Sequence, residues 1–220
     1  RFADAVIVAT PDNMHAEPGL ASIAAGLDLL LEKPISKSAV ECVAIRDAAK
    51  ASGRKVVVCH VLRYSPFYTE IKRIVDSGAI GKVVSMDQVE GVGYWHQAHS
   101  FVRGNWRSAA GSSPMILAKC CHDMDILRWL ADDECRAVSS FGSLSFFTAA
   151  NAPAGAPARC TDGCPASASC PYDALRFYVS KAEDWVKEIL RKVVAVEATA
   201  SASRSWAHGA RSRAIWRRTR

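Results

Sequence analysis

The sequence contains no uninterrupted apolar run that approaches the roughly 20 residues a helix needs to span a bilayer. This absence predicts that the protein has no helical membrane anchor. The chain also begins without methionine and without a signal-peptide pattern, so we expect an internal piece of a longer, cytoplasmic protein. With 50% hydrophobic and 23% charged residues, the composition is that of a folded globular protein and excludes wholesale disorder.

An excess of one charge is missing from most of the chain, although the net charge is +6. Six arginines and one glutamate lie in residues 195–220, so the residues before them are close to neutral. Basicity is therefore a property of the C-terminal end and predicts no nucleic-acid partner. Residues 195–220 are rich in Ala, Ser and Arg and lack apolar periodicity. They are interpreted either as a disordered basic tail or as an out-of-frame translation.

The eight cysteines come without a secretory signal, so a disulfide framework is not expected. Three of them, Cys160, Cys164 and Cys170, cluster in one loop. A closed zinc site needs four ligands, and iron–sulfur clusters usually use four thiolates. Because only three are local, we predict loop cysteines without a metal. The alternative is a metal site that Cys120 or Cys135 completes.

The first part of the sequence alternates between buried-strand and helix patterns. Short apolar runs rich in Val, Ile and Leu are separated by segments with helical periodicity, and Gly or Pro lies at the joints. The pattern predicts strands at 4–10, 27–34 and 55–64, and helices at 15–26 and 37–51, the second capped by Ser36 and ended by Gly53. This β-α-β-α-β order predicts an α/β fold, a parallel sheet with helices on both of its faces.

The second part has a different rhythm and predicts an α+β domain. Its strands are longer and fewer helices separate them. We expect helices at 65–76 and 114–131, strands at 83–92 and 137–147, an irregular aromatic segment at 99–107, and a loop at 151–170.

Four separated motifs resemble the glucose–fructose oxidoreductase and inositol dehydrogenase (Gfo/Idh/MocA) family. They are AVIVATPDNMHAE, LLLEKPIS, RYSPFYTEIKRIVDSGAIGKV and HDMDILRWL, and the resemblance covers about residues 3–180. It implies a Rossmann (doubly wound parallel sheet) domain that binds NAD or NADP. It also implies an α+β domain with an open, mostly antiparallel sheet that covers the nicotinamide and joins copies into a homo-oligomer. The boundaries expected here are 1–62 for a partial Rossmann domain, 63–194 for the second domain and 195–220 for the tail.

One family element is missing from the sequence. Members begin with a strand and a G-x-G-x-x-G turn, whose glycines let the backbone approach the cofactor's diphosphate. No such turn occurs here, and no residue in the matching context reads the ribose. The chain is interpreted as starting at the family's fourth strand, without the first two β-α units and hence without the diphosphate site.

The resemblance implies that Lys33 contacts the reacting hydroxyl and that His122 is the acid/base. Lys33 directly follows an apolar strand, at the edge where open α/β sheets bind ligands, which supports its role. The alternative is that neither residue has a functional role. Lys33 would then be an ordinary lysine at the end of a strand, and His122 a core residue of its helix. Many members carry Asp where Ala118 stands. Lys119 follows it and is expected to share the proton transfer, to bind substrate, or only to pair with Asp123.

The resemblance also implies a set of residues beside the cofactor. The turn after the first strand and the EKP motif would contact its ribose and nicotinamide, and a Trp-Arg pair would reach the cofactor or substrate. These residues are Thr10, Pro11, Asn13, His15, Glu32, Lys33, Pro34, Trp106 and Arg107.

Together these features predict an NAD(P)-dependent oxidoreductase. The expected partner is a small sugar, inositol or related polyol that is oxidised or reduced at one hydroxyl-bearing carbon, with no nucleic acid or membrane involved. One alternative is an NAD-dependent glycosidase of the same family. The other is a non-catalytic truncated paralogue or binding module, which the missing diphosphate turn favours.

Overall fold

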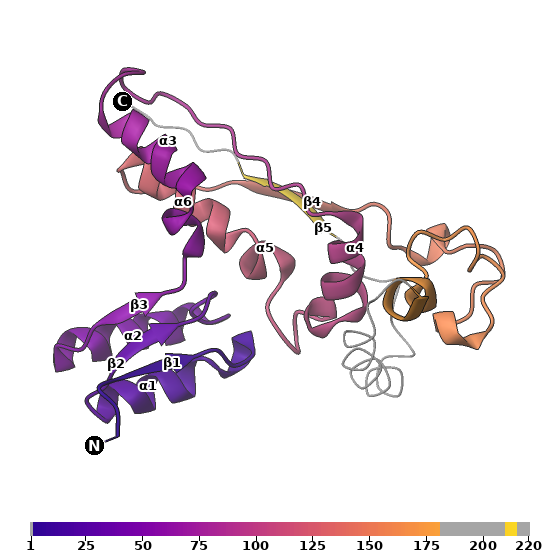
Figure 1. Cartoon of the computed structure of the whole chain (residues 1–220), viewed down its shortest axis with the longest axis horizontal. Coiled ribbons are helices and arrows are strands. Elements are labelled where there is room, and N and C mark those ends of the chain that lie inside the picture. The colour runs from indigo at the N-terminus through magenta and orange to yellow at the C-terminus, as the bar shows by residue number, and fades with distance from the viewer. Residues whose placement is uncertain (1, 181–209, 215–220) are drawn as a thin grey trace. The chain divides into compact units, whose positions relative to one another are not determined.

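A computed structural model describes residues 2–180 and 210–214 of the chain (Figure 1). The chain divides into two units, which are described separately below. Unit 1 consists of Arg1–Glu90, Ala109–Phe141 and Arg213–Arg220, and unit 2 consists of Gly91–Ser108 and Gly142–Ser212. Among the described residues, no helix is both long enough and apolar enough to cross a membrane.

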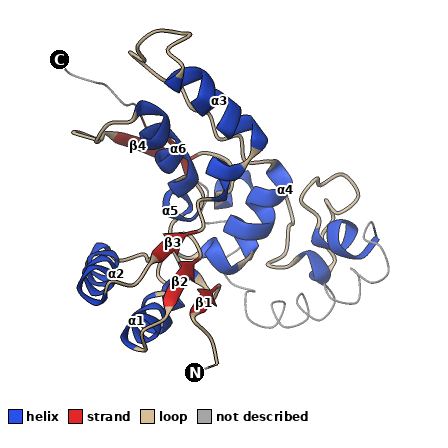
Figure 2. Cartoon of the chain, turned by 60° about the vertical axis from the view of Figure 1, so that its left-hand side comes forward, coloured by secondary structure: helices blue, strands red, loops and turns tan. Residues whose placement is uncertain are grey.

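Unit 1 begins with a three-stranded parallel sheet. It is formed, in this order across the sheet, by β1 (Ala5–Val8), β2 (Asp28–Leu31) and β3 (Val56–Val58). The register pairs Val8 with Leu31 and Leu31 with Val58, so all three strands end at the same edge (Figure 2). The predicted β-α-β-α-β order is confirmed, with strands shorter than the sequence suggested.

Two helices pack on one face of this sheet. They are α1 (Ala16–Ala24) and α2 (Ala39–Ser52), which lie side by side in Figure 2. Val8, Leu29 and Leu31 of the sheet form a buried core with one isoleucine from each helix, Ile23 and Ile45. The prediction of helices on both faces is wrong for the described residues. The strands follow one another in sequence across the sheet, so right-handed crossovers place both helices on the same side.

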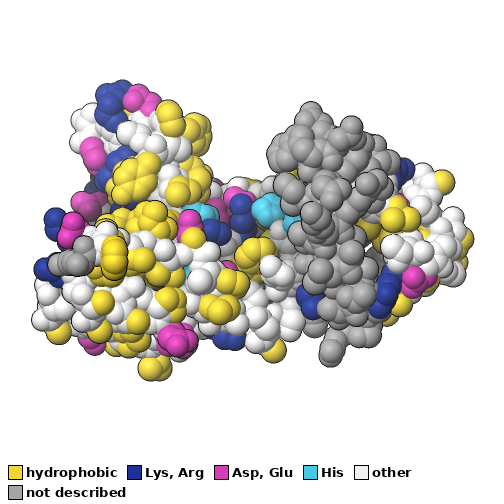
Figure 3. Space-filling view, turned by 60° about the horizontal axis from the view of Figure 1, so that its bottom comes forward, with side chains coloured by type: hydrophobic (Ala, Val, Ile, Leu, Met, Phe, Trp, Pro, Cys, Tyr) yellow, Lys and Arg dark blue, Asp and Glu magenta, His cyan; other side chains and the backbone are white. Residues whose placement is uncertain are grey.

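The opposite face of the sheet exposes an apolar row. Ile7, Leu30 and Val57 are paired in register across the three strands, and their exposed fractions are 68%, 36% and 48%. Figure 3 likewise shows hydrophobic side chains at the surface of unit 1, in the left-hand part of the view. Although the apolar runs of these strands are continuous, the strands are therefore buried on only one face of the sheet.

Helix α2 begins at a different serine from the predicted one. Ser38 is the N-cap, and its hydroxyl accepts a hydrogen bond from the Glu41 amide at 3.4 Å. Ser36, expected to be the cap, is buried; its hydroxyl contacts the Glu41 carboxylate and accepts from the Ser38 amide at 3.0 Å. The helix ends at Gly53 as predicted, because the φ of 67° there lies in the left-handed region that glycine tolerates.

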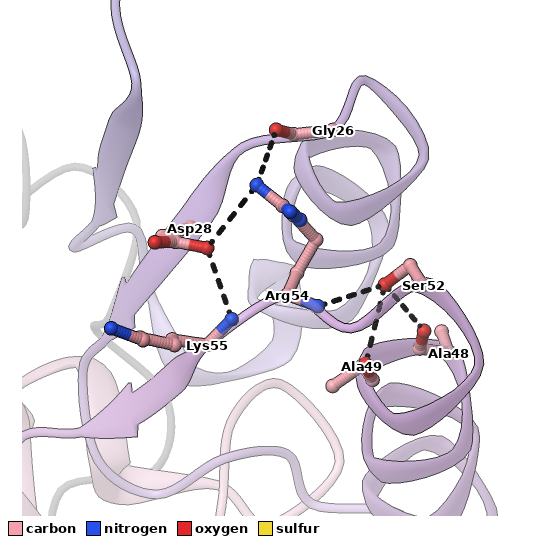
Figure 4. Close-up of polar contacts among 7 residues, drawn as sticks. All are labelled: Gly26, Asp28, Ala48, Ala49, Ser52, Arg54 and Lys55. Atoms are coloured by element: carbon pink, nitrogen blue, oxygen red, sulfur yellow. Dashed lines mark hydrogen bonds and ion pairs between the residues drawn. The ribbon is translucent and has the colours of Figure 1, made fainter.

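Polar contacts fix the amino ends of β2 and β3 (Figure 4). The Asp28 carboxylate accepts a hydrogen bond from the Lys55 amide at 3.0 Å and lies 3.8 Å from the Arg54 guanidinium. Arg54 also donates to the Gly26 carbonyl at 3.4 Å. These groups are partly exposed, so each contributes at most about 1 kcal/mol. They hold the register from the edge opposite to the carboxyl ends of the strands.

In the part of unit 1 that follows the sheet, one predicted helix is present and one predicted strand is not. Helix α3 (Pro66–Asp76) begins after the N-cap Ser65, whose hydroxyl accepts from the Tyr68 amide at 3.3 Å, as the predicted helix at 65–76 required. The predicted strand at 83–92 is absent. Its alternation of apolar and polar residues has no neighbouring strand in the described residues to pair with.

The segment predicted as one helix at 114–131 consists of two. Helix α5 (Met115–Ala118) and helix α6 (Cys121–Ala131) are separated by Lys119 and Cys120 (Figure 1). The apolar periodicity continues through the interruption because residues on both sides of it are buried. The sequence pattern therefore contains no sign of the break.

Unit 2 is built from short helical turns around an aromatic core. Helix α4 (Tyr94–His96) continues into a π-helical turn at Gln97–Arg103 and a 3-10 turn at Asn105–Arg107. Ala98, Val102 and Phe147 form its buried cluster, against which Tyr172 packs. The predicted irregular segment at 99–107 is thus largely helical turns.

The remaining elements are short. Strand β4 (Ser140–Leu144) pairs with β5 (Ala210–Ala214) in a two-stranded sheet, where an open, mostly antiparallel sheet was predicted; that larger sheet is not seen in the described residues. The predicted loop at 151–170 contains only brief 3-10 turns. The prediction of a tail at 195–220 lies outside the described residues, except for β5.

Candidate functional site

Lys33 lies directly beyond the carboxyl end of β2 and reaches the interruption between α5 and α6. Its ammonium donates a hydrogen bond to the Ala118 carbonyl at 2.9 Å. In a continuous helix that carbonyl would accept the His122 amide, but this amide instead donates to the Lys119 carbonyl at 3.3 Å. The Ala118 carbonyl thus binds the Lys33 ammonium at the point where a continuous helix would have the His122 amide.

His122 is on the first turn of α6 and is half-buried. Its Nδ1 atom is buried and has no hydrogen-bond partner among the described residues. Burial lowers the pKa of the His122 imidazole below its ordinary value, and the nearby charge of Lys33 lowers it further. The structure thus places the two predicted catalytic residues, Lys33 and His122, in one electrostatic environment.

Lys119 occupies the interruption itself. Its ammonium forms an ion pair with Glu90 at 3.2 Å, on the extended segment before unit 2. Asp123, one of its expected partners, instead accepts a hydrogen bond from the Gln88 amide group at 2.8 Å. Burial raises the pKa of the Asp123 carboxyl. Lys119 therefore reaches the site with its charge already balanced.

His60 joins this site, although the sequence analysis did not single it out. It follows β3, and its ring stands edge-on to that of His122 with the centroids 5.9 Å apart. Its Nδ1 atom lies 3.9 Å from the Asp125 carboxylate, which Arg63 binds through two hydrogen bonds of 2.7 and 2.6 Å. The signal was available: like Lys33, it comes directly after a buried strand, at the edge where ligands bind.

The turn after β1 is held by buried contacts. Both ring nitrogens of His15 lie 2.7 Å from carbonyl oxygens, those of Pro34 and Thr10, and the side chain is 1% exposed. Asp12 is also buried and contacts the Ser113 hydroxyl. His15 thus ties the joint after β1 to the joint after β2.

The other residues predicted beside the cofactor divide between the two units. In unit 1, four of them lie at the carboxyl edge of the sheet. Thr10, Pro11 and Asn13 are exposed. Glu32 is half-buried, and its carboxylate accepts a hydrogen bond from the Lys33 amide at 3.2 Å. Trp106 and Arg107 belong to unit 2, where Arg107 donates to the Gly104 carbonyl at 3.2 Å. Pro34 is buried and follows Lys33 through a cis peptide bond.

The loop cysteines do not converge. All eight cysteines, which are described residues, are free thiols, and no group of three His, Cys, Asp or Glu side chains in the described ranges could hold a metal ion. Arg176 donates to the backbone carbonyls of Ala168 and Cys170 and so closes the loop that carries Cys160, Cys164 and Cys170.

Two family models match the chain. One, described as the GFO/IDH/MocA C-terminal domain, matches residues 68–216, and the other, an oxidoreductase family with an NAD-binding Rossmann fold, matches residues 2–60. The chain belongs to the GFO/IDH/MocA family. The resemblance drawn from the four sequence motifs is confirmed.

Several relatives of the chain are inositol dehydrogenases. Inositol 2-dehydrogenase 2 of Saccharopolyspora erythraea is 35% identical over 132 residues, which are 60% of this chain and 36% of that protein. Inositol 2-dehydrogenase of Klebsiella pneumoniae is 33% identical over 136 residues, 61% of this chain and 37% of that protein. This chain thus spans little more than a third of the length of these relatives.

Solved structures of the family share the fold. Myo-inositol 2-dehydrogenase from Lactobacillus plantarum has a TM-score of 0.55 and 23% identity, covering 68% of this chain and 43% of that one. Scyllo-inositol dehydrogenase from Lactobacillus casei, solved with NAD(H) and scyllo-inositol, has a TM-score of 0.54 and 24% identity, covering 66% and 42%. At these identities the likeness supports the fold alone.

The residues of unit 1 fit one end of a nicotinamide dinucleotide. The ammonium of Lys33, which has two donors beyond the one bound to Ala118, lies at the carboxyl edge of a parallel sheet, where such cofactors bind. The diphosphate is normally held by a glycine-rich turn, and the sequence has none. The chain therefore has a lysine ammonium at this edge of the sheet and no glycine-rich turn of the usual diphosphate-binding kind.

Proposed function

We propose that this chain carries the catalytic site of an NAD(P)-dependent oxidoreductase that acts on a hydroxyl-bearing carbon of inositol or a related polyol. The observation that carries the proposal is the hydrogen bond from the Lys33 ammonium to the Ala118 carbonyl, beside the half-buried imidazole of His122. A fixed cation next to a neutral base is what the oxidation of an alcohol requires of a protein.

Lys33 orients the substrate hydroxyl. An ammonium group has three N–H donors, and one of them is committed to Ala118. The remaining donors can bind the hydroxyl oxygen and stabilise negative charge as its proton leaves. Because its amine is fixed by a backbone carbonyl, it needs no reorganisation to do so.

His122 accepts the proton from that hydroxyl. The lowered pKa of its imidazole keeps the ring neutral near pH 7, so that a nitrogen lone pair is free to act as a base. The bound nicotinamide supplies the acceptor for the hydride that leaves the same carbon. Lys119, balanced by Glu90, acts as a second donor to the polyol rather than as the base.

The other predicted contacts complete this proposal. We assign the cofactor side to the turn and the EKP motif at the carboxyl edge of the sheet, that is, to Thr10, Pro11, Asn13, His15, Glu32 and Pro34 together with Lys33. The proposal takes either NAD or NADP as cofactor. Trp106 and Arg107 are assigned to the cofactor or the polyol on the resemblance alone.

The test is a turnover assay with this chain. Purified protein is incubated with NAD+ or NADP+ at millimolar concentration and with a panel of inositol isomers and sugars, and the ketone product is detected by mass spectrometry. High cofactor concentration offsets the weak binding expected without a diphosphate cradle. We expect slow oxidation of at least one polyol.

A matched pair of lysine variants controls the assay. Lys37 also donates to a backbone carbonyl, that of Ala110 at 3.1 Å, but lies outside the site. Lys33→Met should reduce turnover by about two to four orders of magnitude, the usual effect of a positioned catalytic group, and Lys37→Met should leave it unchanged. A folded protein that oxidises no polyol contradicts the proposal and supports the non-catalytic alternative.

A further inference from the structure

The two histidines of the site lie next to each other, but the polyol chemistry described above uses only one of them, His122. His60 and His122 come from different parts of unit 1, the end of β3 and the start of α6, yet their rings meet edge to face at 5.9 Å and an angle of 79°. In both rings Nδ1 is buried without a hydrogen-bond partner among the described residues. Such an unsatisfied buried nitrogen costs roughly 1–3 kcal/mol, and proteins retain this cost mainly at functional sites.

The charges around the pair are unequal. Both rings face the cation Lys33 and the carboxylate of Asp125; His122 also faces Lys119, and His60 also faces Arg63. The one carboxylate in contact with the pair, that of Asp125 on α6, lies 3.9 Å from Nδ1 of His60. A proton placed on the pair is therefore stabilised more on His60 than on His122.

Full protonation of the pair is opposed by its surroundings. Two imidazolium rings at this separation would repel each other, and both would also face Lys33. Burial lowers the pKa of His60 as it does that of His122, and the charge of Asp125 opposes this effect in both rings. Groups that interact this strongly titrate as a pair with shared, macroscopic values.

We propose that His60 is a positioning residue for the reaction, which forms with His122 a coupled imidazole pair that holds a single proton. This inference rests on the proposed function for its role. In the oxidation direction the substrate O–H bond breaks and an N–H bond forms on His122. The proton then moves to His60, where Asp125 stabilises it before its release to water, and His122 returns to its neutral form.

The pair can be tested without turnover, by NMR titration of the imidazole signals in this chain. The His60→Gln variant removes the ring and keeps an amide near its place, and His122→Gln is its counterpart. We expect His60→Gln to raise the titration midpoint of His122 by about one pH unit, because the ring that is protonated second no longer meets a charged neighbour. His122→Gln should move the midpoint of His60 less, because His60 takes the first proton while His122 is still neutral.

Two internal controls keep the result interpretable. The backbone amide signals of His15 and His99, which contact other groups, should be the same in both variants as in the wild type. The wild-type chain alone also tests the proposal, because a coupled pair gives titration curves broader than those of a single site. Single-site curves in the wild type, or an unmoved midpoint of His122 in His60→Gln, would overturn it.

Turnover then separates this inference from the proposed function. If the chain oxidises a polyol, His60→Gln should move the acid limb of the kcat profile by about the same pH interval and leave KM unchanged. If the enzyme is active but His60→Gln leaves the pH profile of kcat unmoved, the role of His60 is overturned and the proposed function stands. A chain that shows the NMR shift of His122 and no turnover retains the pair but refutes the proposed oxidoreductase.

Discussion

The β1–β3 sheet with its two helices and the segment from 83 to 131 differ in how directly the sequence determines them. In the first, each element is specified by its own residues: apolar runs form the strands, and Ser38 and Gly53 begin and end a helix. In the second, an expected strand does not form and an expected helix is broken. The broken helix is the region that carries His122. The geometry that we propose to be catalytic therefore lies where local sequence patterns fail and residues far apart in the chain meet.

The largest expected effect is on turnover at the broken helix. His122→Gln removes the proposed base and should lower turnover by about two to four orders of magnitude. Lys119→Ala should lower it by less, because that ammonium is already paired with Glu90. The measurement is steady-state oxidation of the polyol that the wild-type chain accepts. Equal losses in the two variants would show that Lys119 shares the proton transfer.

The second effect is on stability in the sheet, where neighbouring leucines of β2 point to opposite faces. Leu31 is 0% exposed, so Leu31→Ala should cost about 2–5 kcal/mol through lost burial and the cavity left behind. Leu30→Ala, on the apolar row that is open to solvent, should cost less than about 1 kcal/mol. Urea unfolding of both variants measures the difference. Similar losses would mean that the open face is covered in solution.

An intermediate effect is expected in the pH dependence of stability. The folded-state pKa values of His60 and His122 are lowered, so below their unfolded value of about 6.5 the unfolded chain binds more protons. The free energy of unfolding should therefore fall as the pH drops from about 7 to about 5.

The double variant His60→Gln, His122→Gln should flatten this dependence. Asp123, whose pKa is raised, acts in the opposite direction, but it is present in both proteins and cancels in the comparison. Thermal unfolding at several pH values provides the measurement. An equally steep fall in the double variant would assign the acid sensitivity to other groups.

The smallest effect is at the cap of α2. Ser38→Ala should cost about 1 kcal/mol, the usual value of a lost N-cap, while helix α2 still forms. Circular dichroism during urea unfolding can resolve this loss. No loss at all would show that the contacts of Ser36 with Glu41 and the Ser38 amide set the start of the helix, as the sequence analysis had assumed.

The same contrast explains which parts of the structure could be predicted from the sequence. The parallel sheet, the ends of α3 and the family followed from periodicity, caps and motifs. The single-sided sheet could not be foreseen, because an apolar run looks the same whether one face or both are covered. The break before α6 was hidden because Ala118 and Ile126 are buried on either side of it. The side chain that binds the carbonyl at the break, Lys33, is 85 residues away from Ala118 in the chain.

The central claim is that Lys33 takes the Ala118 carbonyl that would otherwise bind the His122 amide. An NMR experiment that detects couplings across hydrogen bonds tests this directly in the wild-type chain. We predict a coupling from the Met124 amide to the Cys120 carbonyl, bonded at 3.0 Å inside α6, and none from the His122 amide to the Ala118 carbonyl. A clear coupling between His122 and Ala118 would show a continuous helix and contradict the account.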